Sequence, residues 1–198
     1  MIYTNINVPF ITKDIIKRKA DLFRQKFWDD IIPIDIEKII DVKLKIDIIP
    51  VPELERLCDT NALITSDWSF IYVDKNIYED ERRINRLRFS YAHEIGHLIL
   101  HKDLYSLFNI NNFADYYGFF NIISGEEYAK IETQANIFAS YLLVPRKMLE
   151  FELKNELKKI ENFGISREAA NPYIADSLGK KFGVSSESME IVLNEYNK

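Results

Sequence analysis

The three histidines of this 198-residue chain all lie between positions 93 and 101. His93 and His97 are four residues apart, within the segment His93-Glu94-Ile95-Gly96-His97. On an α-helix this spacing places both rings on one face, about 6 Å apart along the axis, where they can reach one metal ion. Glu94 points about 100 degrees away, so it can address a metal-bound water without binding the metal. The segment therefore predicts a metal site on a helix.

This arrangement indicates a chemistry. Zinc lowers the pKa of a bound water to about 7, and a carboxylate beside that water can take its proton as it attacks a carbonyl. We therefore expect His93 and His97 to bind zinc and Glu94 to act as the base of peptide hydrolysis. The alternative is a helix whose histidines only cap or pack. It is disfavoured because apolar neighbours such as Ile95 and Leu98 imply burial, and a shared metal would satisfy two buried imidazoles.

A catalytic zinc also needs a third protein ligand and an open position. His101 lies eight residues beyond His93, about 12 Å along a straight helix, so one helix cannot wrap all three rings around an ion. We therefore expect His101 to have a structural role or to support a ligand. The third ligand should come from another helix.

Glu132 is the best candidate for that ligand. Ala135 and Ala139 follow three and seven residues later, so the helix face of Glu132 carries small side chains that allow a second helix to approach closely. The spacing alone leaves open that Glu132 is an ordinary solvated glutamate. Glu126 and Glu127 are rivals, although acidic residues are expected at a helix start because of the helix dipole.

Hydrophobic periodicity predicts an α+β chain. A helix is expected over residues 12–29 after the N-cap Thr12, and a shorter one from Pro33. Alternation around residues 44–48 predicts a strand that ends at Pro50, and residues 61–65 and 70–73 predict a hairpin. Helices are expected from Tyr78 to about His101 and from Gly125 almost to the end. Their boundaries should fall at Pro145, Gly164 and Pro172.

The expected organisation is one domain over residues 1–198, with a small three-stranded sheet packed on the histidine-bearing helix and a mostly helical C-terminal half. Its parts are N-terminal helices (12–42), a sheet region (43–75), catalytic helices (78–142) and C-terminal helices (145–196).

Composition narrows the function. A net charge of −5 disfavours direct nucleic-acid binding, which needs clustered Lys and Arg. The start of the chain lacks a signal-like pattern, and no apolar run approaches the roughly 20 residues that a bilayer needs, so we expect a cytoplasmic protein. The single cysteine, Cys58, excludes an internal disulfide and a paired-thiolate zinc site. The oligomeric state is not indicated.

Two separated motifs carry a family resemblance. They are Arg86-Leu87-Arg88-Phe89-Ser90-Tyr91-Ala92-His93-Glu94-Ile95-Gly96-His97-Leu98, and Glu132-x-x-Ala135-Asn136-x-Phe138-Ala139 with Leu142-Leu143-x-Pro145. Together they resemble the ImmA/IrrE family of metallopeptidases. The resemblance implies a zincin-like fold, with zinc bound by His93, His97 and Glu132 and with Glu94 as the catalytic base.

The resemblance also implies a substrate. Members of the family characteristically cleave or inactivate helix-turn-helix repressors and so switch on mobile-element, phage or stress genes. We therefore expect a zinc endopeptidase whose partner is such a repressor. A strand near residues 70–73 is expected to line the cleft, so that the substrate adds to it as an edge strand. The alternative is a non-catalytic, zinc-stapled anti-repressor that sequesters its partner. Retention of Glu94 favours the enzyme, because a staple needs no base.

Each of three further features of the sequence has more than one interpretation. The aromatic segment 102–124 is expected mainly in the core, although it could cover the cleft or supply a tyrosine to an oxyanion. Arg86 and Arg88 could orient a carboxylate or be solvated helix charges. Residues 175–193 have a helix-turn-helix cadence with Gly183 at the turn, but the second helix starts with acidic residues, so we interpret them as a packing unit.

Overall fold

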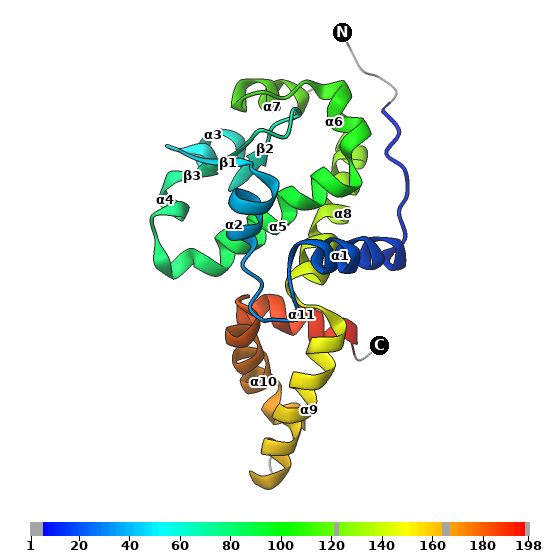
Figure 1. Ribbon diagram of the computed structural model, residues 1–198, viewed down its shortest axis with the longest axis vertical. Helices are drawn as coiled ribbons and strands as arrows, with labels where there is room; N and C mark the ends of the chain where they lie inside the picture. Colours follow the sequence, from blue (N-terminus) through cyan, green and yellow to red (C-terminus); the bar gives the residue numbers. More distant parts are fainter. Residues whose placement is uncertain (1–5, 121–122, 164–166, 197–198) are drawn as a thin grey trace.

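The computed structural model describes residues 6–120, 123–163 and 167–196, and it is a mostly helical α+β structure with a three-stranded mixed sheet (Figure 1). The expected fold class is therefore confirmed. The helices and strands of the described residues are α1 (Lys13–Phe27), α2 (Ile36–Lys38), β1 (Asp47–Val51), α3 (Leu54–Cys58), β2 (Ala62–Ile64), β3 (Phe70–Asp74), α4 (Lys75–Tyr78), α5 (Ile84–Leu100), α6 (Lys102–Phe108), α7 (Phe113–Phe120), α8 (Gly125–Leu143), α9 (Arg146–Phe163), α10 (Arg167–Phe182) and α11 (Ser186–Tyr196).

The central strand of the sheet is β3. It pairs in parallel with β1 and antiparallel with β2, which confirms the predicted hairpin. β1 starts later than the alternation suggested, because a wide helical turn occupies Ile39–Leu44 and Lys45 adopts a left-handed φ of 57°. The expectation that substrate adds along residues 70–73 is wrong, since β3 is paired on both sides. The free edge beside α5 belongs to β2.

The N-terminal helices form largely as expected. The Thr12 side chain accepts a hydrogen bond from the Ile15 N–H and so caps α1. The second helix begins at Ile36 rather than at Pro33, because the Asp35 side chain caps it by accepting from the Lys38 N–H. α1 packs along α8, and the ring centroids of the buried Phe23 and Phe138 lie 6.2 Å apart.

The predicted continuous helix from Tyr78 is interrupted. α4 ends at Tyr78, and the Asp80 side chain accepts from the Arg82 N–H to start a short 3-10 turn. α5 then begins only at Ile84. Asp80 therefore caps a separate turn, and the long helix starts later than predicted.

α5 and α8 cross at the centre of the molecule, at Gly96. A Cβ at this position would lie 3.1 Å from both the Cα and the carbonyl oxygen of Ala135. Gly96 and Ala135 therefore let the two backbones approach closely, and the prediction that the small face of α8 accommodates another helix is confirmed. Phe138, Ala139 and Leu142 of α8 are fully buried beyond this crossing.

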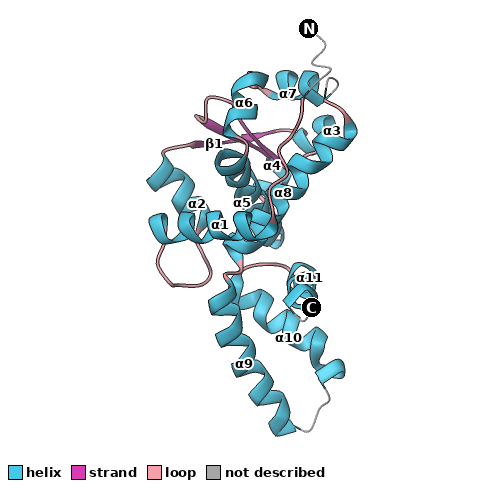
Figure 2. Cartoon of the chain, turned by 90° about the vertical axis from the view of Figure 1, so that its right-hand side faces the viewer, coloured by secondary structure: helices cyan, strands magenta, loops and turns pink. Residues whose placement is uncertain are grey.

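The helices α9, α10 and α11 project from one end of the body that holds the sheet, α5 and α8 (Figure 2). Gly183, with a φ of 66°, makes the turn before α11, and the Ser185 side chain caps that helix, as predicted. Pro172 lies inside α10 instead of starting it, so the missing N–H removes one hydrogen bond without ending the helix. The predicted boundary at Gly164 falls outside the described residues.

Candidate metal centre

Three polar side chains of α5 lie together near the crossing with α8. One ligand atom from each of His93, Glu94 and His97 lies within 4.8 Å of the others. The Nε2 atoms of the two imidazoles are 2.9 Å apart, so the same nitrogen of each ring faces one point. His97 is 2% exposed. The helical spacing of the two histidines therefore produces the shared face that was predicted from it.

Glu132 extends from α8 toward the same point. One carboxylate oxygen lies 3.2 Å from Nε2 of His93, and the other lies 3.6 Å from Nε2 of His97. The side chain is 29% exposed, so the group is only partly covered. Two helices thus bring two imidazole nitrogens and a carboxylate together, which is a donor set suited to zinc.

The rival glutamates of α8 are engaged elsewhere. The side chain of Glu126 is 81% exposed and pairs with Lys130. Glu127 accepts hydrogen bonds from the backbone N–H of Val8 at 2.6 Å and from Lys130 at 2.7 Å. Neither carboxylate contacts the histidines in the described residues, so Glu132 is the acid of this helix that reaches the site.

Glu94 is held by the free edge of the sheet. Its carboxylate accepts a hydrogen bond from the Ile64 N–H of β2 at 2.8 Å. Glu94 is 4% exposed, and this burial raises its pKa to about 7. The charge of His93 acts in the opposite direction, and that of Glu132 adds to the rise. A carboxylate with a pKa near neutrality can both accept and return a proton at neutral pH.

The charges of the site suit a cation. Burial opposes protonation of His93, but its hydrogen bond to Glu132 and the negative charge of Glu94 raise its pKa to about 9. Burial, together with the charges of His93 and His101, lowers the pKa of His97 well below its usual value. At neutral pH one imidazole is therefore protonated between two carboxylates, and a divalent ion at this point would take over that positive charge.

The far nitrogen of each histidine ring is also bound. Nδ1 of His93 lies 2.9 Å from the side-chain oxygen of Asn136 on α8. An amide oxygen only accepts hydrogen bonds, so Nδ1 carries a proton, and Nε2 is the nitrogen that would bind a metal after releasing its own proton. Asn136 therefore fixes the His93 tautomer that a metal requires.

His97 is fixed by a longer chain of hydrogen bonds. The side-chain nitrogen of Gln134 donates to the Pro9 carbonyl, so its oxygen is free to accept from Nε2 of His101, 2.9 Å away. Nδ1 of His101 must then accept from Nδ1 of His97, 3.0 Å away. This order leaves Nε2 of His97 unprotonated and directed at the site. The expected supporting role of His101 thus has a specific geometry.

Replacing His101 with Phe is expected to weaken zinc binding by about 10–100-fold, because His97 loses the partner that fixes its tautomer. Competition with a chromophoric chelator measures this affinity. Lys102→Ala, at the neighbouring exposed position, should leave it unchanged. Equal zinc affinities in His101→Phe and the native protein, with both chains folded by circular dichroism, would remove His101 from the site.

Comparison with known proteins identifies the family. Residues 69–194 match the family model described as the IrrE N-terminal-like domain, peptidase family M78. This match spans more than half of the chain and includes both helices of the site. The chain belongs to this family. No curated protein matches it.

The protein is therefore a metallopeptidase of the M78 family, and its His93-Glu94-His97 group could hold a metal ion. A peptidase acts on a protein substrate. Among the described residues, none of the helices combines the length and the apolar character needed to cross a bilayer.

Sequence reasoning missed two residues that surround the M78 site. Asn136 is part of the second motif and Gln134 lies within it, and the available signal was an amide side chain next to the small residue Ala135. The possibility that Arg86 and Arg88 orient a site carboxylate is not supported. Arg86 contacts Glu55 and Asn61, and Arg88 donates to backbone carbonyls.

The aromatic segment packs partly in the core beside the site, whereas Phe113 and Tyr117 are exposed. Tyr105, Tyr116 and Phe119 are 5%, 8% and 4% exposed. The Tyr105 ring lies 5.3 Å from that of His97, and burial, followed by the charges of Glu94 and Glu132, raises the pKa of its hydroxyl well above the usual value. Tyr105 therefore stays protonated and keeps its donor near the metal site.

Proposed function

We propose that this chain is a zinc endopeptidase in which His93, His97 and Glu132 bind the metal and Glu94 is the catalytic base. The observation that carries the assignment is the position of Glu132, whose two oxygens approach Nε2 of both histidines. Glu94 belongs to the same cluster but is held by the N–H of Ile64. This contact supports Glu94 as the base and Glu132 as the third ligand.

Bound zinc would polarise the scissile carbonyl and acidify the attacking water. In the proposed reaction Glu94 takes one proton of that water as its oxygen forms a bond to the carbonyl carbon. Glu94 then returns the proton to the amide nitrogen as the C–N bond breaks, so its carboxylate is regenerated. Asn136 and His101 keep the two histidines in the tautomers that bind metal.

The proposed substrate is a helix-turn-helix repressor, as the family resemblance implies, and the proposed site of action is the cytoplasm. We propose one domain over residues 1–198, because the C-terminal helices contact the body at several points. Arg88 of α5 donates to the Gly183 carbonyl, and Lys13 of α1 pairs with Glu195.

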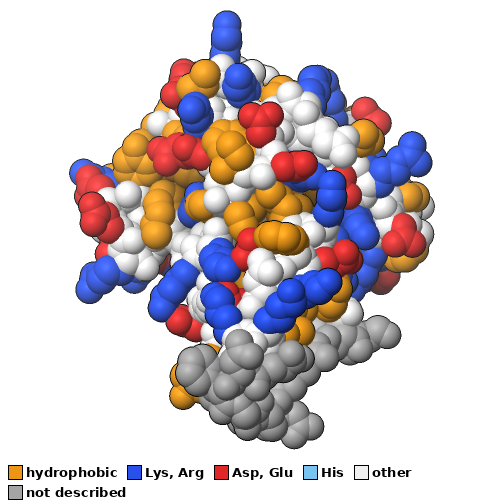
Figure 3. Space-filling view, turned by 60° about the horizontal axis from the view of Figure 1, so that its bottom comes forward, with side chains coloured by type: hydrophobic (Ala, Val, Ile, Leu, Met, Phe, Trp, Pro, Cys, Tyr) orange, Lys and Arg blue, Asp and Glu red, His pale blue; other side chains and the backbone are white. Residues whose placement is uncertain are grey.

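Direct DNA binding by α10 and α11 is not part of the proposal. The exposed positions Glu187 and Glu190 at the start of α11 are acidic and would repel phosphate. Figure 3 shows acidic and basic side chains interspersed over the described surface in that view. Met189 and Leu193 of α11 are buried. These features support the packing role predicted for this unit.

The test is incubation of the zinc-loaded protein with the repressor encoded beside its gene. Cleavage should yield two fragments whose new termini are read by mass spectrometry, and a chelator should abolish it until zinc is restored. A stable complex without fragments would instead favour the sequestering anti-repressor. A repressor that is neither cut nor bound would exclude the proposed substrate.

A further inference from the structure

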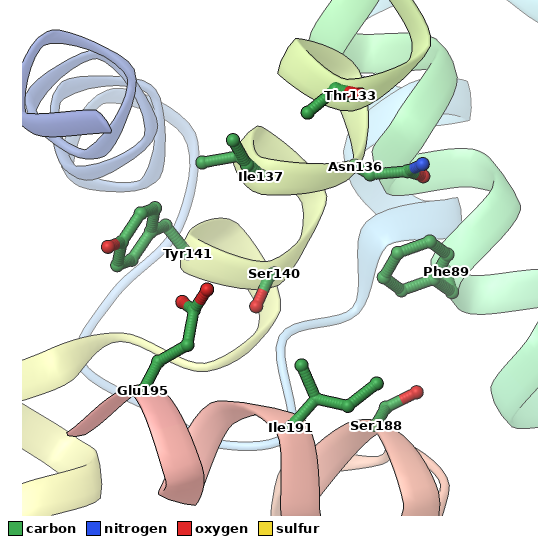
Figure 4. A pocket seen from close by; sticks show the side chains of 9 residues that line it. All are labelled: Phe89, Thr133, Asn136, Ile137, Ser140, Tyr141, Ser188, Ile191 and Glu195. Atoms are coloured by element: carbon green, nitrogen blue, oxygen red, sulfur yellow. The ribbon is translucent and has the colours of Figure 1, made fainter. Parts of the chain in front are cut away.

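A second cavity adjoins the metal site. It has a volume of about 390 Å³ and lies between α5, α8 and α11 (Figure 4). This volume is within the range of about 300–1,000 Å³ typical of ligand pockets. Ser188, Ile191 and Glu195 line it from one face of α11, and Phe89 lines it from α5. The cavity is therefore formed jointly by the catalytic helices and by the C-terminal unit.

The cavity is contiguous with the depression at the proposed metal site, because the two share lining residues. Phe89 and Asn136 line both this cavity and the depression that contains His93, Glu94 and Glu132. Asn136 accepts the hydrogen bond from the His93 ring. Successive Cα atoms of a peptide are about 3.8 Å apart, so a chain whose scissile carbonyl lies at the metal would place a nearby side chain at the cavity mouth.

Most of the exposed surface inside the cavity is apolar, although Thr133, Ser140 and Ser188 add hydroxyl groups. Phe89, Ile137 and Tyr141 line it from α5 and α8, opposite Ile191 of α11 (Figure 4). Ile191 is 59% exposed, so part of this apolar surface has no cover within the described chain. An apolar side chain entering the cavity would remove that surface from water.

The rim of the cavity carries an ion pair. The carboxylate of Glu195 lies at the edge and pairs with Lys13 at 2.8 Å. Both side chains are substantially exposed, so this pairing leaves the rim hydrated. An aliphatic or aromatic side chain could therefore contact the apolar walls without disturbing this ion pair.

We propose that this cavity is a specificity pocket that receives a large apolar side chain, such as Leu, Met or Phe, adjacent to the scissile bond of the substrate. The inference rests on the proposed function and gives the C-terminal helices a role in it, because α11 forms one wall. The pocket selects for local sequence, so an apolar segment exposed in a partner protein would be cut there.

The test compares the zinc-loaded native protein with Ile191→Asp and the matched control Tyr173→Asp. Tyr173 lies on α10 of the same unit and is 75% exposed, so the control carries the same new charge away from the cavity. A mixture of peptides varied at every position is digested, and the cut sites are read by mass spectrometry. We expect the native protein and the control to prefer Leu or Phe over Ala at one position by about tenfold or more.

In Ile191→Asp this preference should fall at least about fivefold, because a second carboxylate enters the apolar wall. An unchanged preference in Ile191→Asp, or no apolar preference in the native protein, would overturn the pocket while leaving peptide hydrolysis intact. If the native protein cuts no peptide, hydrolysis itself is contradicted. The pocket is then judged by calorimetric binding of two peptide hydroxamates, one with an isobutyl and one with a methyl side chain.

With these two hydroxamates, tighter binding of the isobutyl compound that is lost in Ile191→Asp supports the pocket, and equal binding of the two compounds overturns it. Hydroxamates bind metal directly, so a lack of binding by either compound would contradict the proposed metal site and the pocket together.

Discussion

Replacing Glu94 with Gln is expected to lower kcat/KM for peptide cleavage by about 10²–10⁴-fold, the range usual for loss of a general acid–base group. The amide has nearly the shape of the carboxylate and can still accept the hydrogen bond from the Ile64 N–H. It cannot take a proton from water. The change should therefore remove the chemical step while leaving the fold and the bound zinc in place.

Three measurements make the Glu94 result decisive. Zinc content and thermal unfolding should match those of the native protein, and Glu126→Gln, at an exposed acid of α8, should keep full activity. A Glu94→Gln variant that retains native kcat/KM would show that another group accepts the proton. A variant that loses its zinc would instead indicate that Glu94 is a ligand.

Removing the Glu132 carboxylate is expected to have the largest effect on the metal. Loss of a group that only supports a ligand weakens zinc binding by about 10–100-fold, so loss of a ligand should exceed about 100-fold. Glu132→Ala removes the only carboxylate that approaches Nε2 of both histidines among the described residues of α8. Chelator competition measures this affinity, with Glu126→Ala as the matched control.

Glu132→Ala should also have a measurable effect on His93 in the metal-free protein. The hydrogen bond to Glu132 is the largest of the effects that raise the pKa of His93 to about 9, while burial opposes them. Without that carboxylate the pKa of His93 should fall, and a titration of the ring protons by NMR would detect the change. An unchanged pKa together with native zinc affinity would place the third ligand elsewhere.

Much of the site could be predicted from sequence because its geometry is local. The spacing of His93 and His97 fixes a helix face, and this face is the one that the structure shows. The approach of Glu132 required two helices to cross. The small residues Ala135 and Ala139 signalled that contact, but its exact partner, Gly96, became evident only in the structure.

Other features depend on packing that a linear pattern does not encode. The short helices α3, α6 and α7 were not predicted, since α6 and α7 carry aromatic residues that suit a core in any secondary structure. The chain from His97 through His101 and Gln134 to Pro9 joins residues as much as 125 positions apart. No periodicity within one element could reveal it.

Because Gly96 has no side chain, the two helices of the site contact each other closely without help from a metal ion. The helices that carry the histidines and Glu132 already touch backbone to backbone there, so the ion has no need to draw them together. This differs from small zinc domains, in which the metal supplies the free energy that folds the chain. In this protein the close contact of the two helices leads us to expect that a chelator can remove the proposed zinc, and that zinc can be restored, without unfolding of the chain.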